Sequence, residues 1–310
     1  MKVDEIAVTF DCLGDTLVGI MHVPQEPSSM GLLCILAGGP QYRIGCCRQQ
    51  VLLARRLAAT GTPVMRFDYR SMGDSEGADP GLDRTDDIDA AVDAFIDNVP
   101  GLENIVLYGG CDGASAIAIS GWRQSKVSGW ILNNPFTKNE GSQAKVMIKH
   151  YYRQRLFSKQ LWKKVLRLEF DFRGAFLSLA QTLRKARSKT APSQAPAKDP
   201  FDPSRPFTER MLEGWKRFDG DVLLLIGGRS LVAKEFDECV ASSKEWQEVT
   251  GRKKVHRHVM PNADHTFSEP QSRESLFNVL IDWLENCSNS SDRQAKVPPD
   301  DTKIAAMDRD

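Results

Sequence analysis

The sequence predicts an α/β fold, in which a mostly parallel central sheet is flanked by helices. Apolar segments with strand character alternate with segments of helical periodicity along residues 1–134 and again along residues 221–286. With 310 residues, 41% of them hydrophobic, the chain is long enough to bury a substantial core. We therefore expect these two segments to form one core domain, which residues 135–220 interrupt.

The expected elements follow from short apolar runs and from helical spacing, taken in chain order. Residues 5–12 and 16–23 alternate in character and are joined at Gly14-Asp15, which predicts an antiparallel pair at the start of the sheet. Apolar runs predict further strands at residues 31–37, 63–66, 105–108, 130–132 and 221–226. The alternation Val-His-Arg-His-Val predicts a last strand at residues 255–259. Apolar residues at helical spacing predict helices at residues 46–60, 83–98, 113–125, 233–249 and 271–286.

The turn with the sequence Gly-Gly-Cys-Asp-Gly, residues 109–113, carries the clearest chemical signal. It follows the apolar run 105–108 and precedes a helical run of small residues, which is the setting of a G-x-S-x-G nucleophile elbow with Cys111 in the serine position. The flanking glycines permit the strained bend that such a turn requires. A helix N-terminus lowers a thiol pKa, so we expect a reactive Cys111. The alternative is a buried cysteine beside a tight turn.

Five histidines are available as a base, and His265 has the most suitable position. It lies in the loop between the last expected strand, 255–259, and the last expected helix, 271–286. A histidine that follows the nucleophile in chain order, on the last loop, matches the order of residues in α/β-type hydrolytic triads. The sequence therefore predicts Cys111 as nucleophile and His265 as base.

An oxyanion site is also predicted, at the end of the strand 31–37. This strand runs directly into Gly-Gly-Pro-Gln at residues 38–41, where glycines would let backbone N–H groups approach a developing negative charge. We expect the backbone N–H groups of Gln41 and Asp112 to donate there. The alternative is a glycine turn without a further role.

Several motifs together resemble one family, the type 1 hydrolases associated with exosortase A systems. They are Gly-Gly-Pro-Gln-Tyr-Arg at 38–43, Phe-Asp-Tyr-Arg at 67–70, Gly-Asp-Ser-Glu-Gly at 73–77, Cys-Asp-Gly-Ala-Ser at 111–115 and Lys-His-Tyr-Tyr at 149–152. The resemblance covers about residues 5–285. It implies an α/β-hydrolase fold, a cysteine at the elbow, a cytoplasmic location and a link to exopolysaccharide export and protein sorting.

The chain departs from this family at the residue that would orient the histidine. The resemblance places an aspartate at position 230, after the strand 221–226, where this chain has Ser230. Glu235 is the next carboxylate, and the other possible position, after the strand 130–132, holds Asn134. A cysteine thiolate can persist as an ion pair with an imidazolium, so we expect a Cys111–His265 dyad to be active without an acid. The third member stays open between Ser230, Asn134 and Glu235.

Residues 135–220 are too long for a single loop and have helical patterning, which predicts a cap over the site. Between residues 138 and 189 they carry fourteen Lys or Arg against three acidic residues, with apolar residues interleaved. These are either amphipathic helices with a solvated basic face, or a lid that attracts an anionic or lipid-linked substrate or contacts an anionic membrane surface. The acidic segment 74–97 is an alternative partner for them. We expect a flexible loop near 188–206 and a disordered tail at 288–310.

Composition limits the classes of function. A net charge of zero argues against general nucleic-acid binding, and the absence of a signal segment or an apolar run of membrane length predicts a cytoplasmic protein. The seven cysteines lack the spacing of a disulfide framework or a zinc site, so neither a metal nor a cofactor is expected. The oligomeric state stays open.

Two functions remain from these observations. The first is an acyl hydrolase that uses Cys111 and His265 on an ester or thioester, with acyl transfer to a hydroxyl other than water left open. The second is a catalytically weak binding protein for an acylated or lipid-linked glycan intermediate, or for a partner in the export machinery. Ser230 favours the second function, whereas the elbow, the glycine-rich loop and the histidine together favour the first.

Overall fold

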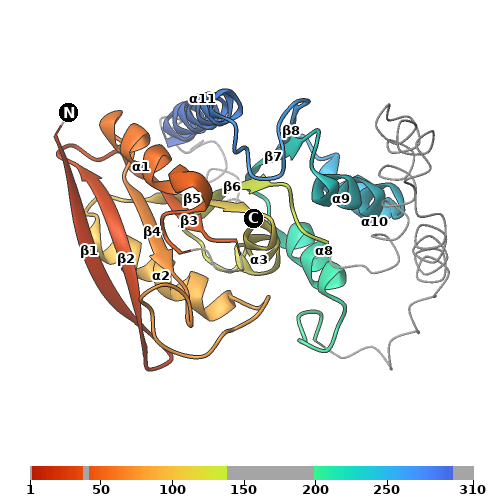
Figure 1. Cartoon of the computed structure of the whole chain (residues 1–310), viewed down its shortest axis with the longest axis horizontal. Coiled ribbons are helices and arrows are strands. Elements are labelled where there is room, and N and C mark those ends of the chain that lie inside the picture. The colour runs from red at the N-terminus through yellow and green to blue at the C-terminus, as the bar shows by residue number, and fades with distance from the viewer. Residues whose placement is uncertain (1, 38–41, 138–198, 296–310) are drawn as a thin grey trace, which may run out of the picture.

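The computed structural model of the chain describes residues 2–37, 42–137 and 199–295, with side chains up to residue 287. One eight-stranded sheet has the order β1-β2-β4-β3-β5-β6-β7-β8 and runs through the centre of the molecule, with helices on both faces (Figure 1). The predicted α/β fold is therefore confirmed.

The strands pair as the sequence predicts. β1 (Val3–Cys12) and β2 (Asp15–Pro24) form the antiparallel start of the sheet, and β2 also pairs with β4 (Val64–Asp68) in antiparallel register. All later pairings are parallel, and they join β4 with β3 (Met30–Ile35), β5 (Asn104–Gly110), β6 (Val127–Asn133), β7 (Asp221–Gly227) and β8 (Val255–Met260). Because parallel strands share one direction, the loops after β3, β5, β6, β7 and β8 meet at one edge.

The helices cover the two faces of the sheet unequally. On one face lie α1 (Gln49–Ala59), which follows a short 3₁₀ turn at Cys46–Arg48, and α11 (Pro270–Ala295). The other face carries α2 (Thr85–Asn98), α3 (Asp112–Ser120) and α8 (Phe207–Arg217), and α9 (Leu231–Ala241) and α10 (Lys244–Thr250) add to the same buried cluster (Figure 1).

Three helices differ clearly from the expected ones, and the first of them, expected at 113–125, ends at Ser120. The helix expected at 233–249 is two helices, α9 and α10, because the Ser243 hydroxyl accepts a hydrogen bond from the Trp246 N–H (3.4 Å) and caps a new start. The last helix was expected to end at 286, but α11 continues to Ala295, so the first part of the tail expected at 288–310 is helical. No helix in the described part of the chain is long and apolar enough to cross a membrane.

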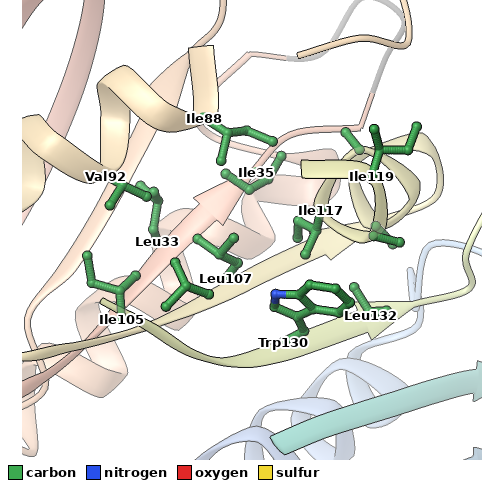
Figure 2. Close-up of a cluster of buried hydrophobic side chains, with 14 of the residues drawn as sticks. Leu33, Ile35, Ile88, Val92, Ile105, Leu107, Ile117, Ile119, Trp130 and Leu132 are labelled. Atoms are coloured by element: carbon green, nitrogen blue, oxygen red, sulfur yellow. The ribbon is translucent and has the colours of Figure 1, made fainter. Parts of the chain in front are cut away.

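The core fills both sides of the sheet. β5 shows the pattern, because Ile105 and Leu107 face α2 and α3 while Val106 and Tyr108 face the layer of α1 and α11, and all four are buried. Strands that are buried on both faces read as continuous apolar runs, which is why the sequence revealed them. Figure 2 shows part of the cluster on the face of α2 and α3, in which Trp130 and isoleucine, leucine and valine side chains from β3, β5, β6, α2 and α3 lie together.

Residues 199–220, the last part of the predicted cap, contain the helix α8, which packs into this core. Met211 and Trp215 of α8 are buried against the sheet layer, and Trp130 stacks on Phe218 at a ring separation of 3.7 Å. Gly214 lets α8 approach α3 closely, since a Cβ there would lie 1.8 Å from the Ala118 carbonyl oxygen. Residues 138–198, which include most of the predicted cap and part of the loop expected near 188–206, lie outside the described residues.

Candidate active site

Cys111 occupies a sharp, strained turn between β5 and α3. Its backbone angles are φ 53° and ψ −123°, a region that side-chain-bearing residues rarely adopt. Glycine is required on the helix side, because a Cβ at Gly113 would lie 2.6 Å from the Leu36 carbonyl oxygen. The Cys111 N–H donates to the Asn133 carbonyl oxygen over 2.9 Å and so ties the turn to β6. This geometry places the thiol at the carboxyl edge of the sheet, directly before the first turn of α3.

Burial determines the protonation state of this thiol. It raises the pKa of Cys111 to about 11, with the charge of the neighbouring Asp112 carboxylate as the second cause. The backbone N–H of Asp112 and the Arg84 guanidinium act in the opposite direction. The shift is therefore opposite to the one expected from the helix N-terminus alone, because removal of the thiolate from water outweighs the helix dipole. Cys111 is a neutral thiol at neutral pH.

His265 and Ser230 meet at the same edge, after β8 and β7. His265 Nδ1 lies 3.0 Å from Ser230 Oγ, and Ser230 Oγ also accepts the N–H of Ala233 over 3.2 Å as the N-cap of α9. Burial lowers the pKa of His265, while the carboxylates of Asp264 and Asp112 partly oppose this shift. The imidazole is therefore neutral near pH 7. A neutral imidazole fits the role of a base that accepts a proton, and it fits less well the role of the cation in an ion pair.

The loop that carries His265 is held by side chains from two other elements. Asn134 Nδ2 donates to the His265 carbonyl oxygen over 2.9 Å, and Asn134 Oδ1 accepts the Gly227 N–H over 2.7 Å. On the other side, Gln49 Nε2 donates to the carbonyl oxygens of Thr266 and Phe267. The Asn134 amide thus binds backbone atoms and ties the ends of β6 and β7 to the histidine loop. The side chain that contacts the imidazole is Ser230.

Glu235 and Gln41 complete the set of predicted residues. Glu235 is buried on α9, and its charge is one of the smaller causes that raise the pKa of Cys111. Gln41 lies outside the described residues. Of the two expected oxyanion donors, the structure therefore describes the surroundings of the Asp112 N–H group.

Arg84 is a residue of this site that sequence reasoning missed. Its guanidinium is buried, donates to Asp112 Oδ2 over 2.7 Å and to the Leu36 carbonyl oxygen over 2.9 Å, and lies 4.1 Å from the centre of the Tyr69 ring. The available signal was that Arg84 is the single cation between Asp74 and Asp97, a stretch with nine acidic residues. This isolation distinguishes Arg84 from its neighbours in the sequence but does not identify Asp112 as its partner.

Comparisons with known proteins identify the family and the fold of the chain. The profile of the alpha/beta hydrolase family matches residues 37–275. An esterase from Pyrococcus furiosus is 16% identical, with a TM-score of 0.60 and 92% of each chain covered. A putative alpha/beta hydrolase from Agrobacterium tumefaciens is 18% identical, with a TM-score of 0.55 over 92% of this chain and 97% of that one.

A third similar structure is Est1E from Butyrivibrio proteoclasticus, solved with bound ferulic acid. It is 17% identical, with a TM-score of 0.55 over 91% of this chain and 99% of that one. At these identities the likenesses show a shared fold. No curated protein sequence matches the chain.

Proposed function

Because the chain belongs to the alpha/beta hydrolase family, we propose that it is an acyl hydrolase in which Cys111 attacks an ester or thioester carbonyl. The observation that carries this proposal is the backbone of Cys111, held at φ 53° and ψ −123° between β5 and α3. Strain of this kind persists only where the surrounding structure enforces it, and it is common at nucleophile turns. The proposal does not extend to amides, because a thiol is better suited to esters, lactones and thioesters.

The proposed reaction starts from a neutral thiol and a neutral imidazole. As Cys111 Sγ bonds to the substrate carbonyl carbon, its proton passes to His265 Nε2, and the carbonyl oxygen becomes an oxyanion. The backbone N–H groups of Asp112 and Gln41 are the proposed donors to that oxyanion. The leaving alcohol or thiol takes the proton from His265, and the acyl group remains on sulfur as a thioester. Water, deprotonated by His265, then releases the acid and restores the thiol.

Ser230 supports this scheme because a hydroxyl permits the required tautomer. For Nε2 to accept a proton, Nδ1 must carry one, and Ser230 Oγ at 3.0 Å can accept it. In a serine triad the loss of the acid costs about 10⁴ in rate when an amide enforces the wrong tautomer. A serine hydroxyl can donate or accept and enforces neither tautomer. The dyad of Cys111 and His265 can therefore work with Ser230, although without the charge that an aspartate would supply.

The experiment that tests this function is intact-mass analysis after brief exposure to acyl nitrophenyl esters and acyl thioesters of different length. We expect an acyl adduct on the wild-type chain and none on Cys111→Ala. Cys239→Ala is the matched control, because burial also raises the pKa of that half-buried thiol to about 11. An adduct on Cys111→Ala that equals the wild-type adduct would remove Cys111 from the mechanism.

The substrate class follows from charge and from the resemblance noted above. We propose an acyl substrate that is anionic or lipid-linked, because residues 138–189 carry fourteen cations against three acidic residues. The motifs at 38–43, 67–70 and 111–115 favour a role beside exosortase A systems and exopolysaccharide export, and with it a cytoplasmic location. Acyl esters with and without an anionic group, compared at low and high salt, test the charge preference.

A second function, a catalytically weak binding protein, has two specific observations in its favour. The position that would carry the acid holds Ser230, and burial leaves Cys111 protonated at neutral pH. In that case neither an adduct nor released product would appear across the ester and thioester panel, while the protein would still bind an acylated or lipid-linked glycan.

A further inference from the structure

Arg84 is a buried cation that joins the nucleophile turn to the strand before the expected oxyanion loop. It directly precedes α2, and only 3% of the residue is exposed. Arg84 Nη2 donates to Asp112 Oδ2 over 2.7 Å, and Nη1 donates to the Leu36 carbonyl oxygen over 2.9 Å. Asp112 directly follows Cys111, and Leu36 lies two residues before the segment 38–41. One guanidinium thus binds the residue after the nucleophile and the start of the segment that follows β3.

Tyr69 packs against this guanidinium. The Arg84 Cζ atom lies 4.1 Å from the centre of the Tyr69 ring, and the Tyr69 hydroxyl donates to the Ala37 carbonyl oxygen over 3.3 Å. A planar guanidinium stacked on an aromatic ring has a defined direction for each N–H group, which a lysine ammonium lacks. Arg84 and Tyr69 therefore hold two consecutive carbonyl groups, those of Leu36 and Ala37, at the end of β3.

The charge of Arg84 is located where the proposed reaction develops negative charge. The Asp112 carboxylate lies one residue from the thiol that must lose its proton, and its charge is the second cause, after burial, that raises the pKa of Cys111. The Arg84 charge lowers that pKa. A carboxylate beside an oxyanion site would also oppose the transition state, so a buried cation on that carboxylate favours both steps.

We propose that Arg84 is a positioning residue of this site, which fixes Asp112 beside the nucleophile and neutralises its carboxylate. The inference rests on the proposed function and deepens it, because it names the residue that keeps the expected Asp112 donor and the end of β3 in register. Arg84 acts through Asp112 and Leu36 and does not need to touch the substrate.

The test measures the rate at which iodoacetamide alkylates Cys111, followed by peptide mass, as a function of pH. Arg84→Gln removes the Arg84 charge, which lowers the pKa of Cys111, from the Asp112 carboxylate, and we expect the alkylation profile to move to higher pH. A displacement by one pH unit corresponds to an about tenfold lower rate at a fixed pH below the midpoint. Asp112→Asn should move the profile to lower pH, and the double variant should return it toward that of the wild type.

Arg70→Gln is the matched control, because Arg70 binds a buried carboxylate, Asp87, over 2.8 Å at a different place in the fold. It should leave the Cys111 profile unchanged. Arg84→Lys keeps the positive charge but cannot make the two hydrogen bonds of the planar guanidinium. It should keep the alkylation profile of Cys111, while kcat for a nitrophenyl ester falls and KM stays the same. If Arg84→Gln does not fold, Asp112→Asn and Arg84→Lys decide the question by the same readouts.

The inference is overturned if folded Arg84→Gln, or folded Asp112→Asn, keeps the wild-type alkylation profile. It is also overturned if Arg84→Lys keeps the wild-type kcat. Alkylation needs no substrate, so this outcome is separate from the proposed function. If acyl adducts are absent from the wild type while the alkylation profile moves as expected, the acyl hydrolase is contradicted and the charge relation between Arg84 and Cys111 still holds.

Discussion

At the scale of the residue, the site is built from two neutral groups. Burial raises the pKa of the Cys111 thiol to about 11 and lowers that of the His265 imidazole, so each shift favours the uncharged form. A thiolate–imidazolium pair would need both shifts in the opposite direction. In the proposed mechanism, a general-base arrangement therefore takes the place of the ion pair expected from the sequence, and the proton moves only as the carbon–sulfur bond forms.

The pH dependence of Cys111 alkylation follows from this. Because the thiolate forms only as the pH approaches about 11, we expect the rate to rise continuously up to at least pH 9 in the wild type. An ion pair would instead give a reactive plateau at acidic pH, and such a plateau would contradict the neutral pair. Acylation has a different lower limit, since it needs neutral His265. It should persist below the ordinary histidine pKa of about 6.5.

Ser230→Asp tests the role of the residue beside the imidazole. A carboxylate at this position would fix the Nδ1–H tautomer and stabilise the imidazolium that forms during acylation. We expect kcat/KM for acyl esters to increase about tenfold, a change of about 1.4 kcal/mol in the activation free energy, and the acidic limb of the pH profile to move to higher pH. Ser230→Ala is the control and should lower kcat/KM. Equal rates for all three proteins would show that position 230 does not act on His265.

At the scale of the element, the approach of α3 to β3 determines where the thiol lies. A Cβ at Gly113 would lie 2.6 Å from the Leu36 carbonyl oxygen, whereas a Cβ at Gly110 would lie 3.8 Å from its nearest neighbours in Asn133. We expect Gly113→Ala to cost about 1–3 kcal/mol of unfolding free energy, as overpacking does, and to reduce acylation strongly. Chemical denaturation and the acyl-adduct assay measure these effects.

Gly110→Ala belongs to the same turn and serves as the control for Gly113→Ala. Its Cβ meets only ordinary van der Waals contacts. It should therefore retain most of the stability and most of the acylation rate. If both substitutions were equally harmful, or both harmless, the close packing of α3 on β3 would not be what positions Cys111.

The elements show which features can be predicted from the sequence. The strands and the turn at 109–113 depend on local patterns, such as apolar runs and glycines on both sides of a cysteine, and these were predictable. Asn134 binds the His265 backbone across 131 residues of sequence, and Arg84 binds Asp112 across 28. The Asn134 contact leaves no local pattern, and the position of Arg84 among nine acidic residues does not specify which carboxylate it binds. The pKa of Cys111 was predicted with the wrong sign because burial depends on the whole fold.

At the scale of the whole molecule, α8 ties the segment after residue 198 into the core. Gly214 lies against the Ala118 carbonyl oxygen, and the neighbouring Trp215 is buried against Trp130 and Trp246. We expect Gly214→Ala to force α8 away from α3 and to lower the free energy of unfolding by about 2 kcal/mol or more. Thermal and chemical unfolding measure this loss.

The same variant separates global stability from the local site. Gly214 is on α8. The three atoms nearest to a Cβ at this position belong to Ala118 and Ile119, and none of them belongs to the turn at 109–113. We therefore expect the pH profile of Cys111 alkylation in folded Gly214→Ala to match that of the wild type. A profile that moved with stability alone would mean that the alkylation assay reports folding, and the shifts expected for Arg84→Gln would lose their meaning.

The most direct test of the central claim is the identity of the acylated atom. After brief reaction with an acyl nitrophenyl ester, we expect the acyl group on the peptide that contains Cys111, and we expect neutral hydroxylamine to remove it, as it removes a thioester. The burst of nitrophenol should equal one per chain and disappear in Cys111→Ala. An acyl group on another residue, or one that hydroxylamine leaves in place, would contradict a mechanism through the Cys111 thiol.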